Sequence, residues 1–201
     1  MSTRHVVLAL LNIQPATGYE LAQVMKESIE PLWSATHSQI YPALHKLERD
    51  GLILGEEGLR GTRMKRVVYR VTDEGVRELE EWIARPVQYL PFRDPFRLWA
   101  SYFDVCPPEV IERNLEEHIK LQTERAEQLA ERASKLAKGN HPLFRAREGR
   151  VPSAELERIK KARSFIYGEL AALARFEAES ATRIREAARA MHASRDEETA
   201  E

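Results

Sequence analysis

The chain has 201 residues, of which 43% are hydrophobic and 31% are charged, and its formal net charge is −1. This length and apolar content suffice for a buried core in one or two domains. The charge balance gives no overall attraction to nucleic acid, so any contact with DNA has to come from a local patch.

The chain begins with two helical patterns. The first helix is predicted over Val6–Leu11 and is apolar nearly all round, so it needs burial on more than one side. Pro15 and Gly18 mark a break after it. Tyr19 then starts a second helix, which carries an apolar stripe and a polar face.

A third helix is predicted to end at Asp50-Gly51, because glycine is favoured in the left-handed conformation that closes a helix. Ile40, Leu44 and Leu47 form its inward face. The opposite face carries side chains able to reach phosphates and base edges of a DNA duplex. These are Ser38, Gln39, Tyr41, His45 and Lys46.

Two short strand patterns follow, and they flank a basic loop. Leu52–Leu54 and Val67–Val71 are expected to pair in antiparallel fashion around the loop Gly58–Arg66. No acidic residue occurs from Gly58 to Thr72, where the basic residues are Arg60, Arg63, Lys65, Arg66 and Arg70. A helix followed by a hairpin with a basic tip predicts a winged helix that binds DNA. The alternative is a hairpin tip whose charges serve only solubility.

Short motifs occur along this part of the chain in a definite order and spacing. They are Gly18-Tyr19-Glu20-Leu21, Gln39-Ile40-Tyr41-Pro42-Ala43-Leu44, Leu47-Glu48, Gly51-Leu52-Ile53 and Tyr69-Arg70-Val71-Thr72-Asp73-Glu74-Gly75. Together they resemble the PadR family of bacterial transcriptional regulators, over about Val6–Trp82. Thr72 also has a physical role of its own, because it can cap the next helix, whose first turn is acidic.

The resemblance implies a winged helix-turn-helix that binds pseudo-palindromic operators as a homodimer, usually to repress transcription. The recognition helix of the family corresponds to Thr36–Asp50 and its wing to Leu52–Val71. On the helical side, this correspondence places near DNA the residues Tyr19, His37, Ser38, Gln39, Tyr41 and Lys46. On the wing it places Arg60, Thr62, Arg63, Lys65 and Arg66.

The second half of the chain is predicted to be helical. The proline-marked segment Pro86–Pro95 forms a boundary, and Asp94-Pro95 can open a short helix. Long helices are then expected over Glu109–Lys138 and Ser153–Met191. At 1.5 Å per residue the last one is about 60 Å long, more than a domain of this size can cover alone. We therefore expect a homodimer through these long helices and, as a further contact, the first helix. The alternative is an intramolecular helical hairpin.

The expected fold is mainly α with a small β-hairpin. Residues 1–85 would form a winged helix-turn-helix DNA-binding domain, residues 86–193 a long-helix dimerisation and effector domain, and residues 194–201 a disordered tail. The second domain resembles the longer, virulence-activator-like C-terminal domain of one PadR subgroup.

Members of the PadR family often respond to small molecules, phenolic acids in the founding case. Aromatic and basic residues near the domain boundary are candidates for such a ligand site. They are Tyr89, Phe92, Arg93, Trp99 and Tyr102, and the alternative is that these aromatic residues are ordinary core.

No catalytic motif, metal-ligand spacing or phosphate-binding loop is present in the sequence, so we expect neither enzymatic activity nor a cofactor nor a metal. A single cysteine, Cys106, and the absence of a long apolar segment favour a cytoplasmic protein without a membrane partner. The competing function is a winged helix that serves as a protein-interaction adaptor. The basic wing argues against it, because protein interfaces tend to exclude charge from their centres.

Overall fold

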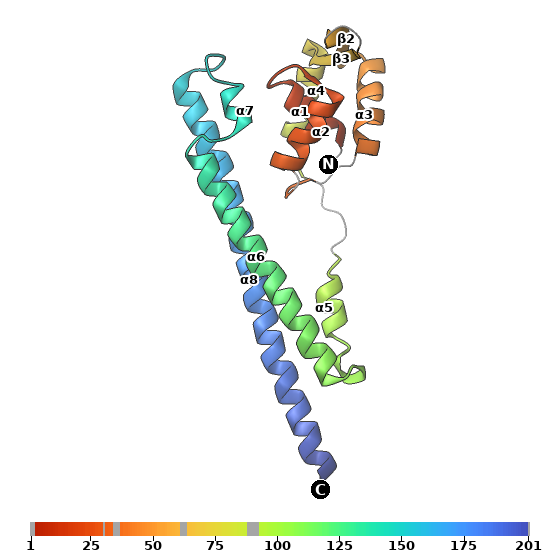
Figure 1. Ribbon diagram of the computed structural model, residues 1–201, viewed down its shortest axis with the longest axis vertical. Helices are drawn as coiled ribbons and strands as arrows, with labels where there is room; N and C mark the ends of the chain where they lie inside the picture. Colours follow the sequence, from red (N-terminus) through yellow and green to blue (C-terminus); the bar gives the residue numbers. More distant parts are fainter. Residues whose placement is uncertain (1–2, 30, 34–36, 61–63, 88–92, 201) are drawn as a thin grey trace. The chain divides into compact units, whose positions relative to one another are not determined.

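The computed structural model describes residues 3–29, 31–33, 37–60, 64–87 and 93–200. It contains two compact units, Met1–Leu90 and Pro91–Glu201, whose elements are labelled in Figure 1. The division between the units lies inside the proline-marked segment Pro86–Pro95.

Helices form the core of the first unit. They are α1 (Thr3–Leu11), α2 (Gly18–Val24), a π-helical turn η1 (Met25–Ile29), α3 (His37–Arg49) and α4 (Asp73–Ala84). Val7 and Leu8 of α1 are fully buried, because α1 packs against α3, α4 and strand β3, described next. Most of the apolar surface of α1 is thus covered within its own unit, and the dimer contact predicted for this helix stays a prediction.

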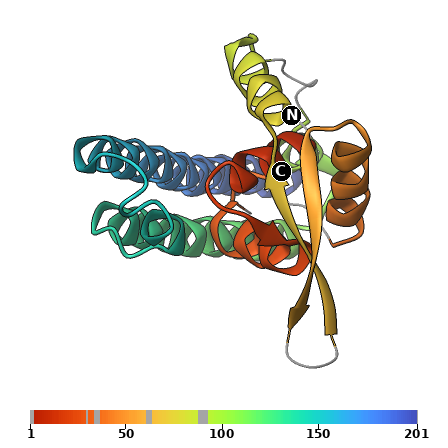
Figure 2. The same ribbon diagram turned by 90° about the horizontal axis from the view of Figure 1, so that it is seen from above.

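An antiparallel sheet of β1 (Ala16–Thr17), β2 (Ile53–Arg60) and β3 (Met64–Val71) completes this unit, in the order β1-β3-β2. The pairing of β2 with β3 runs from Ile53↔Val71 to Arg60↔Met64. Figure 2 shows the two strands twisting around each other and extending beyond the helices.

The sheet corrects the predicted hairpin. Residues 58–60 and 64–66, expected in a loop, belong to the two strands. The apolar alternation of a half-buried strand is absent there, yet the antiparallel ladder continues because it pairs the backbone N–H and C=O groups. Strand β1 was not predicted, and it pairs with β3 through Ala16↔Tyr69 and Thr17↔Val68.

The predicted helix boundaries around the sheet are confirmed. Gly51 closes α3 with a φ of 74°, in the left-handed region that glycine adopts without strain. Thr72 caps α4, because its Oγ1 accepts a hydrogen bond of 3.1 Å from the backbone N–H of Gly75.

The second unit is built on two long helices, α6 (Pro108–Ala137) and α8 (Ser153–Ala200), which run side by side in both views (Figures 1 and 2). Two short helices, α5 (Pro95–Ala100) and α7 (Pro142–Arg145), and a 3₁₀ turn, η2 (Phe103–Val105), accompany them. Asp94 caps α5 as predicted. No helix within the described residues is both long and apolar enough to cross a membrane.

The polar segment from Ser194 to Ala200 also has helical backbone, where the sequence predicts a disordered tail. This segment contains only residues other than glycine and proline, so nothing in it stops the helix that precedes it.

Small residues make up much of the face of α8 that packs on α6. Four alanines are buried on this side of α8, Ala171, Ala174, Ala181 and Ala188, together with the larger Leu156 and Tyr167. Several larger apolar residues of α8 lie outside this contact and are exposed, including Ile166 at 46%, Leu173 at 57% and Phe176 at 52%. Alanine lets two helices approach closely, so the small residues lie in the contact and leave the large ones outside.

Candidate nucleic-acid interface

Helix α3 presents a polar face because its large aliphatic residues are used in the core. Ile40, Leu44 and Leu47 are fully buried. The exposed positions on the other side are Ser38, Gln39, Tyr41, His45 and Lys46. This is the polar face that the sequence predicted. His37 begins the helix, and its side chain lies outside the described part of the structure.

Tyr19 lies beside this face because of the local structure of β1 and α2. Thr17 and Glu20 form a capping box, in which Thr17 Oγ1 accepts from the Glu20 N–H at 3.2 Å and the Glu20 carboxylate accepts from the Thr17 N–H at 2.8 Å. Gly18 leaves room for the ring of Tyr41, since a Cβ at Gly18 would lie 2.8 Å from Tyr41 Cε1. Tyr19 itself is 62% exposed.

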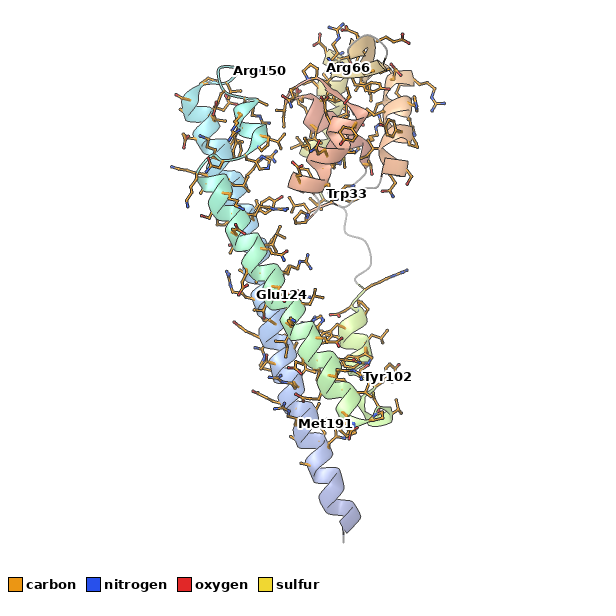
Figure 3. The ribbon with its side chains drawn as sticks, in the orientation of Figure 1. Trp33, Arg66, Tyr102, Glu124, Arg150 and Met191 are labelled. Carbon is orange, nitrogen blue, oxygen red and sulfur yellow. The ribbon has the colours of Figure 1, made fainter. Side chains whose placement is uncertain are left out.

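The basic residues of the wing lie mainly on strands. Arg66 of β3 is exposed and pairs in register with Gly58, so no side chain stands opposite it (Figure 3). Arg70, on the same strand, forms an ion pair of 2.8 Å with Glu56. Arg60 ends β2 and Lys65 lies on β3 opposite Leu59, as far as their backbones show. Thr62 and Arg63 lie outside the described residues.

A groove of about 830 Å³ joins the three elements. Its lining includes Tyr19 and Gln23 from α2, Tyr41 and His45 from α3, and Arg66 from β3. Three residues predicted from the sequence, Tyr19, Tyr41 and Arg66, therefore share one surface. His45, which the sequence placed on the polar face of α3, extends it, and so does Gln23, which was not predicted. Each lies four residues after a predicted tyrosine on the same helix. Residues four apart share one helix face, so this spacing in the sequence could have indicated that they line the same surface.

Tyr69 is a buried residue in the lining of this groove. Burial raises the pKa of its hydroxyl, and the negative charge of Glu48 adds to the effect. The groove is therefore lined by a neutral phenol together with the cationic Arg66, and it offers hydrogen-bond donors to a partner rich in acceptors.

Residues 7–81 match the model of the transcriptional regulator PadR-like family. This part of the chain is a PadR-like domain. It contains α3, the strand pair and the whole groove described above.

Known proteins similar to this chain agree with that result. The negative transcriptional regulator PadR of Bacillus subtilis strain 168 is 38% identical over 105 residues, which cover 51% of this chain and 57% of the relative. The chain thus spans little more than half the length of this curated relative.

Solved structures extend the similarity beyond the PadR-like domain. Bacillus subtilis PadR in complex with operator DNA superposes with a TM-score of 0.71 at 24% identity, covering 88% of this chain and 94% of that one. The structure of the same protein in complex with p-coumaric acid superposes with a TM-score of 0.57 at 23% identity, covering 85% of this chain and 97% of that one. The Vibrio cholerae virulence activator AphA superposes with a TM-score of 0.63 at 22% identity, covering 94% of this chain and 99% of that one. These likenesses establish the fold.

The ligand residues predicted outside the PadR-like domain are only partly described. Tyr89 and Phe92 lie outside the described residues. Trp99 is half-buried and packs edge-on against Phe103, with 5.2 Å between ring centroids. Arg93 and Tyr102 are exposed; Tyr102 is labelled in Figure 3. The ligand set therefore stays a prediction.

Arg97, near these residues, pairs with carboxylates of the protein itself. Its guanidinium contacts Asp94 at 2.6 Å and Glu177 at 3.0 Å. These contacts raise the pKa of Arg97, first through the hydrogen bond to Asp94 and then through the one to Glu177. Arg97 thus fastens α5 to α8.

Proposed function

We propose that this chain is a homodimeric transcriptional regulator that binds a pseudo-palindromic operator through α3 and the β2–β3 strand pair. The observation that carries this proposal is the groove shared by α3 and β3, in which Tyr41, His45 and Arg66 lie on one surface. A polar helix suits the major groove of DNA, and the cations beside it suit the phosphates. The complex of Bacillus subtilis PadR with operator DNA supports this use of the fold.

The second unit provides the surface for the proposed dimer. Ile166, Leu173, Phe176 and Met191 leave large apolar side chains exposed on α8. A second copy of the chain would cover them, because a twofold contact places the same residues on both sides of the interface. Two DNA-binding units held at a fixed separation would then match the two half-sites of an operator.

The relatives support a proposal for the direction of control and for the effector. We assign repression because the Bacillus subtilis relative is a negative transcriptional regulator. We assign a phenolic acid as effector because Bacillus subtilis PadR forms a complex with p-coumaric acid. The residues proposed for this ligand are Tyr89, Phe92, Arg93, Trp99 and Tyr102. A regulator of this kind acts in the cytoplasm, where the bacterial chromosome lies.

Binding to the DNA upstream of the protein's own gene tests the proposal. Fluorescence anisotropy at several salt concentrations should show an affinity that falls steeply as salt rises, because bound phosphates release counterions. Unrelated DNA of equal length is the control, and p-coumaric acid should weaken binding to the upstream DNA alone. Equal, weak binding to both DNAs would refute the operator function and favour the protein-interaction adaptor.

A further inference from the structure

Three arginines gather at the end of the α6–α8 pair that carries α7. Arg132 lies on α6, Arg163 lies on α8, and Arg147 follows α7. A hydrogen bond of 3.0 Å from Ser164 Oγ to the carbonyl of Ala133 fixes the register of the two long helices, so Arg163 and Arg132 lie at the same level. These charges do not belong to the nucleic-acid interface, which is in the other unit.

The core of this region holds the arginines in place. Phe144 of α7 is fully buried in an apolar cluster, and the N–H of Arg147 bonds to the Phe144 carbonyl at 2.9 Å. Arg163 lies four residues from both Ile159 and Tyr167, which belong to the same cluster. Arg163 therefore occupies a position on α8 that an apolar residue would fill in an ordinary helix pair.

The positive charges have no ion-pair partner within the described residues. Two neighbouring carboxylates are engaged elsewhere: Glu131 with Lys135 and Glu157 with Lys160, each at 2.7 Å. Arg132 places its guanidinium 6.0 Å from the ring centre of Tyr167. Its Nη1 atom is buried and has no hydrogen-bond partner in the described structure.

Burial of these positive charges is unfavourable. Burial lowers the pKa of Arg163, and it lowers the pKa of Arg147, where the charge of Arg163 adds to the effect. Glu155 acts on Arg147 in the opposite direction and is the weakest influence. Charges taken out of water destabilise a fold unless a partner compensates them.

We propose that Arg132, Arg147 and Arg163 form a binding site for a small phosphate-type oxyanion. Guanidinium groups donate paired N–H bonds that match the oxygens of a phosphate, and three of them suit a doubly charged group. The anion would supply the acceptor that Arg132 Nη1 lacks and would compensate the charge of Arg163. Free phosphate and the phosphate group of a small metabolite share this chemistry.

Thermal unfolding of the full chain tests the site. Inorganic phosphate should raise the melting temperature above its value in chloride of equal ionic strength, and the rise should level off as the site saturates. Because phosphate also stabilises proteins non-specifically, the deciding comparison is with Arg163→Met, which should lack the saturable part. The matched control, Arg145→Met, removes an exposed arginine of α7 and should keep the full response. An equal response in wild type and Arg163→Met, or no response in wild type, would overturn the proposal.

A second set of measurements separates the ligand from the fold. In chloride, Arg163→Met should melt at the same temperature as wild type or higher, because it removes an uncompensated buried charge. Titration calorimetry should show phosphate binding at least tenfold weaker in Arg147→Gln than in wild type, which provides an independent variant. Glycerol 3-phosphate in the same titration distinguishes a free anion from a phosphate ester: tighter binding of the ester assigns a metabolite, and weaker binding assigns free phosphate. Unchanged phosphate affinity in Arg147→Gln would also refute the site.

Discussion

The carboxylate of Glu48, in the last turn of α3, accepts a hydrogen bond of 3.1 Å from the backbone N–H of Gly55 on β2. Gly55 permits this contact because it lacks a side chain: a Cβ there would lie 2.5 Å from Glu48 Oε1. The bond joins the helix that carries Gln39 and Tyr41 to the strand pair that carries Arg66. The two parts of the proposed DNA surface are therefore held in a fixed relation.

Replacing Glu48 should loosen that relation. We expect Glu48→Ala to lower the free energy of unfolding by about 1 kcal/mol, the usual contribution of one hydrogen bond, and to weaken operator binding further. Glu48→Gln is the matched variant, because its amide oxygen can still accept from Gly55. Urea denaturation measures the first effect. Equal losses in the two variants would show that the bond does not matter and that the negative charge does.

Two arginines of β3 should differ in their importance for DNA. Arg66 is exposed and forms no ion pair among the described residues, whereas Arg70 is held by Glu56. We expect Arg66→Ala to weaken operator binding and to reduce the slope of log affinity against log salt by about 1, as the loss of one phosphate contact does. Arg70→Ala should change the slope less. Anisotropy titrations at several salt concentrations compare the two, and equal slopes in wild type and Arg66→Ala would contradict the assignment.

A charge on the exposed apolar face of α8 should break the proposed dimer. Leu173 is 57% exposed, and Leu173→Glu would place a carboxylate in the interface, where its burial is costly. Arg175→Glu is the control, because residues two apart point about 200° away from each other around a helix. Light scattering coupled to gel filtration should show a monomer for Leu173→Glu and a dimer for the control. A dimer in both cases would place the subunit contact elsewhere.

His118 should make the second unit sensitive to acid. Its ring stacks on Phe96 with 3.7 Å between centroids and 4° between planes, and its Nε2 is buried without a hydrogen-bond partner in the described structure. Burial lowers the pKa of His118 below 6.5, and the charge of Arg97 contributes, while Glu177 and Asp94 act in the opposite direction.

The sign of the resulting pH dependence follows from this lowered pKa. As pH falls through about 6.5, the unfolded chain binds a proton at His118 before the folded chain does, so stability decreases until the folded pKa is reached. The effect should be absent at higher pH. Unfolding measured between about pH 7.5 and 5.5 should show a smaller loss of stability in His118→Gln than in wild type. Parallel curves for the two proteins would contradict this role.

The sequence predicts the helices of this protein better than its contacts. The spacing of Ile40, Leu44 and Leu47 correctly identifies the buried face of α3, because large apolar residues at helical spacing have one favourable place. On α8 the large apolar residues are divided between two faces, since Leu156 is buried, whereas Leu173 is exposed beside the buried Ala174. The hydrophobic pattern alone does not determine whether two helices pack at a short interaxial distance through alanine or at a longer one through leucine.

The residues of the candidate site could also be predicted only in part from the sequence. Tyr19, Tyr41 and Arg66 could be assigned from local pattern and family resemblance, and the structure brings them to one groove. The extent of the strands could not, because residues 58–60 and 64–66 lack the alternation of apolar and polar residues that marks a half-buried strand. Gln23 joins the groove only through the packing of α2 beside α3, which is a long-range contact.

The two apolar stripes of α8 are offset by a single residue. Tyr167, Ala174, Ala181 and Ala188 recur at intervals of seven and pack in the unit's own core, while Ile166 and Leu173 precede two of them and stay outside. In the proposed dimer, the surface that would pair two copies is therefore separate from the surface that packs the α6–α8 hairpin. Substitutions at Ile166 or Leu173 could alter which copies pair with one another and leave the α6–α8 hairpin intact, so that duplicated genes could acquire separate partners without rebuilding their folds.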